Sequence, residues 1–262
     1  MPKTILLTNS GGSFGLATML ALGRAGHTVY GGLYRLAGAN HCEILDIAQR
    51  ENLDLRVIPL DVFSQTSVDA AVELLMRQTG RLDAVIHNSG YLMSGAADAF
   101  TAEQLSRLYE MNVISTQNVN RAVIPQLRRQ RQGLIVWVSS VSSAGSIPPY
   151  LAPYFSKASM DSVASAYAQE LASAGIGCCT VLPRWVHGDR RGAVIDPGSV
   201  AEVIGTLIEL PTGEHPLRIF VHCRGTAKRR EDTVRGFAST VLPLAPRRER
   251  HALKTAPSRR AI

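Results

Sequence analysis

The chain has 262 residues, of which 45% are hydrophobic and 19% charged, and its formal net charge is +7 at pH 7. These values suit a soluble globular protein with one large domain and a sizeable buried core. Because no apolar run reaches transmembrane length and the first residues lack the features of a signal peptide, we expect a cytoplasmic protein without membrane contact.

The positive charge is concentrated at the C-terminal end. Residues 224–262 hold eleven basic and three acidic residues, whereas the rest of the chain holds 17 basic and 18 acidic ones. A basic tail could touch nucleic acid or acidic surfaces, but this one carries no recognisable binding module. We therefore expect residues 223–262 to be a partly disordered basic segment, with no nucleic acid partner. The four cysteines lack the spacing of metal ligands, so no metal site is expected.

The first predicted strand, residues 4–8, leads into a glycine-rich turn. The turn occupies residues 9–15 and is followed by a helical pattern over 16–25 and a second strand over 27–33. A glycine-rich turn between a strand and a helix lets the backbone approach a pyrophosphate, and the helix N-terminus supplies N–H donors. Small residues also serve ordinary tight packing, so the turn by itself leaves both interpretations open.

Strands and helices then alternate to residue 221. The further predicted strands are residues 55–60, 83–87, 134–138, 176–182 and 217–221. The further predicted helices are residues 43–51, 67–78, 103–131, 154–174 and 197–210. The third of these helices is interrupted at Asn112. The alternation predicts an α/β fold, a Rossmann-like doubly wound parallel sheet that forms a single domain over residues 1–222.

In such a sheet, ligands bind at the carboxyl ends of the strands, so the polar groups that follow each strand converge. These groups are Ser10 to Gly15, Arg35, Asp61, Asn88 to Gly90, Ser139 to Ser143, and Pro183-Arg184. Because several elements contribute to it, this convergence is stronger evidence for a ligand site than the glycine-rich turn alone.

Ser140, Tyr154 and Lys157 form a candidate acid/base set. A phenol is a poor acid or base at neutral pH because its reference pKa is about 10. A nearby ammonium group favours the phenolate and so brings the phenol closer to a useful acid/base. A serine hydroxyl beside them can hydrogen-bond a substrate oxygen as charge shifts onto it.

Over roughly residues 3–222 the chain resembles the short-chain dehydrogenases/reductases. The motifs that carry the resemblance are the glycine-rich turn, Asp61-Val62, Asn88-Ser89-Gly90, Asn112, Ser140, and Tyr154 with Lys157. The resemblance implies NAD(P)-dependent interconversion of a small-molecule alcohol and a carbonyl compound. It implies that Tyr154 is the acid/base, that Lys157 holds the nicotinamide ribose and favours the Tyr154 phenolate, and that Ser140 positions the substrate. Asn112 would support a proton-relay water.

The resemblance also implies a cofactor site. Its expected residues are Thr8, Ser10, Gly11, Gly12, Ser13, Phe14, Gly15, Arg35, Asp61, Val62, Asn88, Ser89, Gly90, Lys157 and Pro183. Asp61 would contact the adenine. Arg35 stands where an acidic residue would bind a ribose 2′-OH, and an arginine suits a 2′-phosphate, so we expect NADP rather than NAD. Relatives commonly form dimers or tetramers through the two long helices, which implies a homodimer or homotetramer.

Three departures from the family pattern leave a second hypothesis open. Asn9 and Ser13 replace family glycines, although asparagine adopts positive φ more readily than most residues. Lys157 follows Tyr154 by three residues rather than four, which on a helix would rotate the lysine by about 100°. The third departure is Arg184, in place of a glycine. The alternative is a catalytically impaired relative that serves as a nucleotide-binding or scaffolding protein.

One further difference lies at the end of the strand over residues 83–87. His87 replaces the first asparagine of the family's Asn-Asn-Ala-Gly motif. We expect it to be a packing residue at the strand end rather than a catalytic group.

Overall fold

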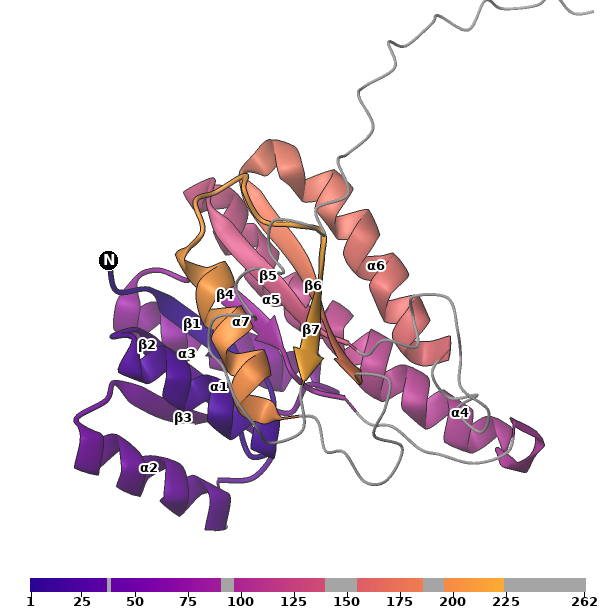
Figure 1. Cartoon of the computed structure of the whole chain (residues 1–262), viewed down its shortest axis with the longest axis horizontal. Coiled ribbons are helices and arrows are strands. Elements are labelled where there is room, and N and C mark those ends of the chain that lie inside the picture. The colour runs from indigo at the N-terminus through magenta and orange to yellow at the C-terminus, as the bar shows by residue number, and fades with distance from the viewer. Residues whose placement is uncertain (37–38, 91–96, 140–154, 186–195, 224–262) are drawn as a thin grey trace, which may run out of the picture. The chain divides into compact units, whose positions relative to one another are not determined.

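The computed structural model of the protein describes residues 1–36, 39–90, 97–139, 155–185 and 196–223, in which seven parallel strands form one sheet (Figure 1). The strands are β1 (Thr4–Leu7), β2 (Thr28–Leu33), β3 (Leu55–Pro59), β4 (Ala84–His87), β5 (Gly133–Val138), β6 (Ile176–Trp185) and β7 (Arg218–Cys223). Their order is β3-β2-β1-β4-β5-β6-β7, so the chain reverses direction across the sheet between β1 and β4. This order confirms the predicted Rossmann-like doubly wound sheet.

Helices connect the strands. They are α1 (Ser13–Arg24), α2 (Ala39–Glu51), α3 (Gln65–Thr79), α4 (Ala102–Tyr109), α5 (Ser115–Gln130), α6 (Phe155–Leu171) and α7 (Pro197–Glu209). Short 3-10 turns occur at η1 (Ala97–Ala99) and η5 (Ala172–Ala174), and a π-helical turn, η2 (Glu110–Ile114), joins α4 to α5. None of the helices in the described part of the chain is long and apolar enough to span a bilayer.

The helices cover both faces of the sheet. Ile5 and Leu7 of β1 belong to the buried cluster that includes side chains of α1 and α7, whereas Leu6 belongs to the cluster beneath α3, α5 and α6. Successive side chains of a strand point to opposite faces, so a strand buried on both faces is apolar at every position. This explains the short continuous apolar runs in the sequence.

Local signals set the helix ends. The Ser64 side chain caps α3 by accepting from the Ser67 N–H, and Gly80 ends this helix in the left-handed conformation. Thr101 and Gln104 form a reciprocal capping box at the start of α4. The predicted interruption at Asn112 is confirmed, because the π-helical turn η2 contains this residue.

Two predicted boundaries are wrong in ways that affect the site. α1 begins at Ser13 rather than at residue 16, so the last three residues of the glycine-rich turn form the first turn of the helix. β6 continues to Trp185 rather than ending at residue 182, and Pro183 pairs with Val221 of β7. The register of β5 with β6 ends at Val181, so Pro183 needs no ladder donor on that side.

Candidate active site

The turn between β1 and α1 is tight and holds one residue in the left-handed conformation. Asn9 has a φ of 52°, in the left-handed region that glycine usually occupies. Ser10 is fully buried and donates its N–H to the Gly32 carbonyl oxygen of β2 at 3.0 Å. Gly15 packs directly on the turn, because a Cβ at this position would collide with the Asn9 carbonyl oxygen. Asparagine therefore supplies the conformation that a glycine would supply, and Gly15 permits the close approach of α1.

The N-terminus of α1 is open to a ligand. Its N-cap residue is Gly12, and no side chain among the described residues caps the helix. A Cβ at Gly12 would meet no heavy atom of the described chain within 4 Å, and Ser13 is exposed. The first N–H groups of a helix lack intrahelical partners and carry partial positive charge, which suits a pyrophosphate. The residues present therefore fit a dinucleotide cofactor.

Thr8 joins this turn to the loop after β4. Its Oγ1 accepts hydrogen bonds from the backbone N–H groups of Asn88 and Ser89, each at 3.0 Å. The Asn88 side chain donates from Nδ2 to the Asn9 carbonyl oxygen at 2.9 Å. These bonds fix the carboxyl ends of β1 and β4 relative to each other.

Two charged side chains follow β2 and β3. Arg35 is exposed, and its guanidinium carbon lies 5.7 Å from the centroid of the Tyr34 ring. Asp61 is half-buried and accepts the Phe63 N–H through Oδ1 at 3.0 Å, while Val62 is buried in the core. An exposed guanidinium after β2 is available to a phosphate group, whereas a carboxylate there would bind a ribose hydroxyl.

Lys157 places an ammonium group in the interior at the carboxyl edge of the sheet. It lies in the first turn of α6, is 5% exposed, and donates from Nζ to the Val138 carbonyl oxygen of β5 at 3.4 Å. A Cβ at Gly90 would lie 2.5 Å from this Nζ, so the loop after β4 packs against the ammonium group. A side chain at position 90 would displace the lysine.

The π-helical turn η2 brings Asn112 to the same place. Asn112 is fully buried and donates from Nδ2 to the Oγ of Ser156 at 2.9 Å, next to Lys157 in the sequence. Its Oδ1 would lie 3.2 Å from a Cβ at Gly90. π-Helical turns inside α-helices are frequent at functional sites, and this one delivers an amide to the lysine.

Burial dominates the electrostatics of Lys157. It lowers the pKa of the ammonium group to about 8, and the negative charge of Asp161 acts in the opposite direction. Asp161 lies one helical turn later on α6 and is 2% exposed. At pH 7 Lys157 is therefore mostly protonated, but its pKa lies closer to pH 7 than that of an exposed lysine does.

His87 belongs to the packing beneath the site, as predicted. Its ring stacks on Trp137 with 5.1 Å between the centroids, and Trp137 stacks on Tyr167 at 6.2 Å. The His87 Nε2 lies 2.9 Å from the Oδ1 of Asn120. Burial lowers the pKa of His87 to about 4, so the ring is neutral at pH 7.

Two of the candidate catalytic residues, Ser140 and Tyr154, lie outside the described residues. Ser139, the last described residue after β5, is buried and donates its N–H to the Val181 carbonyl oxygen at 2.9 Å. The described part of α6 begins at Phe155, so the helix start predicted at residue 154 and the orientation of Tyr154 relative to Lys157 also lie outside the described residues.

Sequence reasoning missed two residues beside Lys157. Ser156 contacts Asn112 across 44 positions of the chain, and no local pattern announces such a contact. Asp161 had a signal, because it follows Lys157 by four residues and stands beside the buried positions Met160 and Ala164. A charged residue within a buried helical stripe is uncommon enough to mark a functional position.

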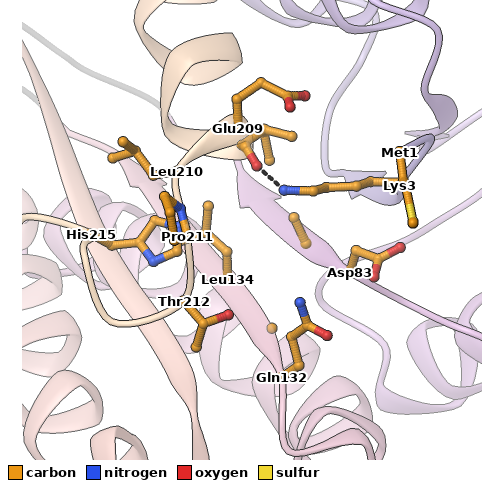
Figure 2. A pocket seen from close by; sticks show the side chains of 13 residues that line it. Met1, Lys3, Asp83, Gln132, Leu134, Glu209, Leu210, Pro211, Thr212 and His215 are labelled. Atoms are coloured by element: carbon orange, nitrogen blue, oxygen red, sulfur yellow. Dashed lines mark hydrogen bonds between the residues drawn. The ribbon is translucent and has the colours of Figure 1, made fainter.

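A separate cavity lies at the opposite, amino edge of the sheet (Figure 2). It has a volume of about 240 Å³ and is lined by residues from the starts of β1, β4 and β5 and from the end of α7. Lys3 Nζ donates to the Ile208 carbonyl oxygen near the C-terminus of α7. Asp83 accepts the Thr4 N–H at 2.8 Å and pairs with Arg81 at 2.5 Å. Lys3 and Asp83 each bind other groups of the protein, so the cavity has the character of a structural junction.

Comparison with known families and curated proteins identifies relatives across most of the chain. The family model described as short chain dehydrogenase matches residues 3–196. A 3-ketodihydrosphingosine reductase of Bacteroides thetaiotaomicron is 30% identical over 205 residues, which cover 78% of this chain and 70% of that protein. A cyclopentanol dehydrogenase of Comamonas sp. is 29% identical over 208 residues, covering 78% of this chain and 81% of the relative.

Solved structures share the same fold. A metagenomic short-chain oxidoreductase in complex with NADP superposes with a TM-score of 0.74 at 17% identity, covering 85% of this chain and 97% of the other. At this identity the likeness concerns the fold alone.

Proposed function

The chain belongs to the short-chain dehydrogenase family, and we propose that it is an NADP-dependent oxidoreductase that interconverts a small-molecule alcohol and a carbonyl compound. The family uses NAD(P). The reaction class is supported by the names of two relatives, a 3-ketodihydrosphingosine reductase and a cyclopentanol dehydrogenase, which both refer to an alcohol or a ketone.

The observation that carries the proposal is the buried ammonium group of Lys157. A charge in the interior is expensive and persists where its surroundings or its function require it. Here Lys157 lies against Gly90 and beside the bond from Asn112 to Ser156, at the sheet edge where parallel α/β sheets bind ligands.

The proposed roles follow from this placement. The bound nicotinamide would supply or accept a hydride. Tyr154 exchanges a proton with the substrate oxygen, and Ser140 hydrogen-bonds the same oxygen. Lys157 holds the nicotinamide ribose and stabilises the Tyr154 phenolate by its charge, and Asn112 supports a proton-relay water.

The cofactor would lie along the carboxyl edge of the sheet. We assign the pyrophosphate to the α1 N-terminus, the adenine to Asp61, and a 2′-phosphate to Arg35. The remaining proposed contacts are Thr8, Ser10, Gly11, Gly12, Ser13, Phe14, Gly15, Val62, Asn88, Ser89, Gly90 and Pro183. The exposed guanidinium of Arg35 supports the preference for NADP.

A fluorescence titration tests cofactor binding and its specificity. NADPH should give a saturable signal, and NADH should bind about tenfold or more weakly, because Arg35 adds a charge-assisted contact to the phosphate alone. Arg35→Leu should remove this difference while leaving NADH affinity unchanged. If neither nucleotide binds to the purified protein, the enzymatic proposal fails.

Turnover on a panel of carbonyl substrates tests Tyr154. Tyr154→Phe should abolish reduction while keeping NADPH affinity, because it removes the hydroxyl and little else. Tyr150→Phe is the matched control from the same segment and should keep turnover. Unchanged turnover in Tyr154→Phe would remove Tyr154 from its role.

A catalytically impaired relative is the second candidate. The observation that favours it is the sequence spacing, because Tyr154 stands three residues before Lys157 where the family pattern has four. This candidate predicts NADPH binding without turnover on any carbonyl substrate. The titration and the substrate panel together separate the two functions.

We also propose a homodimer or homotetramer that uses α4, α5 and α6. Tyr109, Ile114 and Phe155 are exposed at 37%, 48% and 37%, and the rings of Tyr109 and Phe155 contact each other with centroids 6.2 Å apart. Apolar side chains gathered on neighbouring helices are typical of an interface. Light scattering should report an oligomer, and Ile114→Glu should shift it toward the monomer without loss of folding.

A further inference from the structure

Lys157 and Asp161 place two opposite charges on one buried face of α6. They are four residues apart, so their side chains lie on the same side of the helix. Lys157 is 5% exposed and Asp161 is 2% exposed, although α6 carries exposed positions on its other side. Lysine and aspartate side chains are almost never buried to this extent unless they are paired with an opposite charge.

The other described groups around Lys157 carry no charge. Gly90 approaches from the loop after β4, the Asn112 amide from η2, and the Val138 carbonyl oxygen from β5. The Val138 contact is long, at 3.4 Å, so it compensates little of the hydration that the ammonium group has lost. Asp161 is thus the described group whose charge offsets the burial of Lys157.

We propose that Asp161 is a positioning residue whose carboxylate keeps Lys157 charged and oriented at the carboxyl edge of the sheet. The inference rests on the proposed function, because the charged lysine is needed there to hold the ribose and stabilise the Tyr154 phenolate. Without the carboxylate, burial acts unopposed and the neutral amine becomes the favoured form near neutral pH. A neutral amine stabilises no phenolate.

The sign of the effect follows from the two charges. Burial already holds the pKa of Lys157 near 8, and the attraction of Asp161 keeps it from falling further. In Asp161→Asn the lysine should lose its proton at lower pH. NADPH affinity and turnover should then fall as pH rises through this lower value, while at pH 6 both should stay close to wild type.

The test uses isosteric, conservative and control variants of the full chain. The titration of Lys157 is followed by NMR of labelled lysine side chains in the cofactor-free protein, with Lys157→Met to assign the signal. Asp161→Asn should shift the midpoint of the Lys157 titration about one pH unit lower, and Asp161→Glu should return the midpoint most of the way to the wild-type value. Asp46→Asn, at an exposed position of α2, should leave it unchanged.

The functional arms are NADPH affinity and turnover measured against pH. Asp161→Asn should weaken NADPH binding about fivefold at pH 8 and less than about twofold at pH 6, because these are the changes in the charged fraction of Lys157 that a shift of about one pH unit produces. A loss of equal size at both pH values, with an unchanged lysine titration, would show a merely structural role and overturn the proposal.

The test still gives an answer if Asp161→Asn does not fold or if the wild-type protein binds no NADPH. If Asp161→Asn does not fold, a wild-type Lys157 signal that titrates below pH 7 would by itself contradict the inference. If wild type binds no NADPH, the proposed function fails, yet the NMR titration still reports whether Asp161 controls the charge of Lys157.

Discussion

The amino and carboxyl edges of the sheet carry similar charged side chains, but these side chains serve different purposes. At the amino edge, Asp83 pairs with Arg81. Lys3 interacts with the carbonyl end of α7, as Figure 2 shows. At the carboxyl edge, the ammonium group of Lys157 is held against Gly90, and the N-terminus of α1 has no side-chain cap. The charged side chains described at the amino edge serve contacts within the protein, and we propose that Lys157 and the first turn of α1 at the carboxyl edge serve a ligand.

This difference separates stability from function. Charged partners that bind each other stabilise the fold and leave nothing for chemistry, whereas groups kept open lower stability and gain a ligand. Substitutions at the amino edge should therefore change unfolding and spare the cofactor site. Substitutions at the carboxyl edge should do the reverse.

The largest effect is expected from Lys157→Met. Turnover should fall about 10³-fold, because the charge that favours the phenolate is lost. The free energy of unfolding should fall by about 3 kcal/mol or less, because the variant removes the cost of burying an ammonium group but leaves the Asp161 carboxylate buried without its counter-charge. Steady-state kinetics and urea unfolding measure both quantities. A large loss of stability in Lys157→Met with full turnover would contradict the assignment of the carboxyl edge to function.

Asp83→Ala should give the opposite result. The Asp83 carboxylate is 6% exposed and binds Arg81 and the Thr4 N–H, so its removal should lower the free energy of unfolding by about 3 kcal/mol. NADPH affinity should be unchanged well below the melting temperature. Asp69→Ala, at an exposed position of α3, is the control for urea unfolding. A tenfold loss of NADPH affinity in Asp83→Ala would show that the amino edge also contributes to cofactor binding.

Acid should destabilise the protein through His87. Its folded pKa of about 4 lies below the unfolded value of about 6.5, so the unfolded state binds the proton first as pH falls. This stabilisation is complete above pH 6.5 and is lost toward pH 4, with about 2 kcal/mol lost between pH 7 and pH 5.

Urea unfolding at pH 7 and pH 5 measures this loss. His87→Asn is the matched variant, because asparagine keeps a polar side-chain N–H group near Asn120 but does not titrate. It should reduce the difference between the two pH values. If the variant lost as much unfolding free energy between pH 7 and pH 5 as wild type, the acid sensitivity would come from another group. One such group is His27 at the amino edge, whose pKa is also lowered by burial.

The smallest effect is expected from Lys3→Met. The Lys3 ammonium group interacts with the carbonyl end of α7, a contact worth about 0.5 kcal/mol, so the melting temperature should fall by about 1–2 °C. Thermal unfolding measures this, with turnover as the internal control. A change in turnover would show that the amino edge contributes to the site.

The sheet could be predicted from the sequence because its strands are short apolar runs at regular spacing. The length of β6 could not, because a proline after an apolar run usually ends a strand, and the tolerance of Pro183 depends on β5 stopping at its side. The break in the 103–131 helix was visible at Asn112. Its π-helical form and the contact with Ser156 depend on tertiary packing.

The site was predicted in outline for a similar reason. Residues that follow strands converge in any doubly wound sheet, so Thr8, Asn88 and Gly90 could be placed near one another. The conformation of Asn9 was foreseeable, since asparagine tolerates positive φ. The burial of Asp161 was not foreseen, because its partner Lys157 was considered with Tyr154 alone.

The hydroxyl of Thr8 has a consequence for the order in which the protein folds. It binds the backbone N–H groups of Asn88 and Ser89, 80 and 81 residues later in the chain. During synthesis the first βαβ unit emerges long before these partners exist, and closing so large a loop is entropically slow. The bonds that join Thr8 to the loop after β4 therefore form only once β4 has been added beside β1, so this part of the carboxyl edge is completed late in folding.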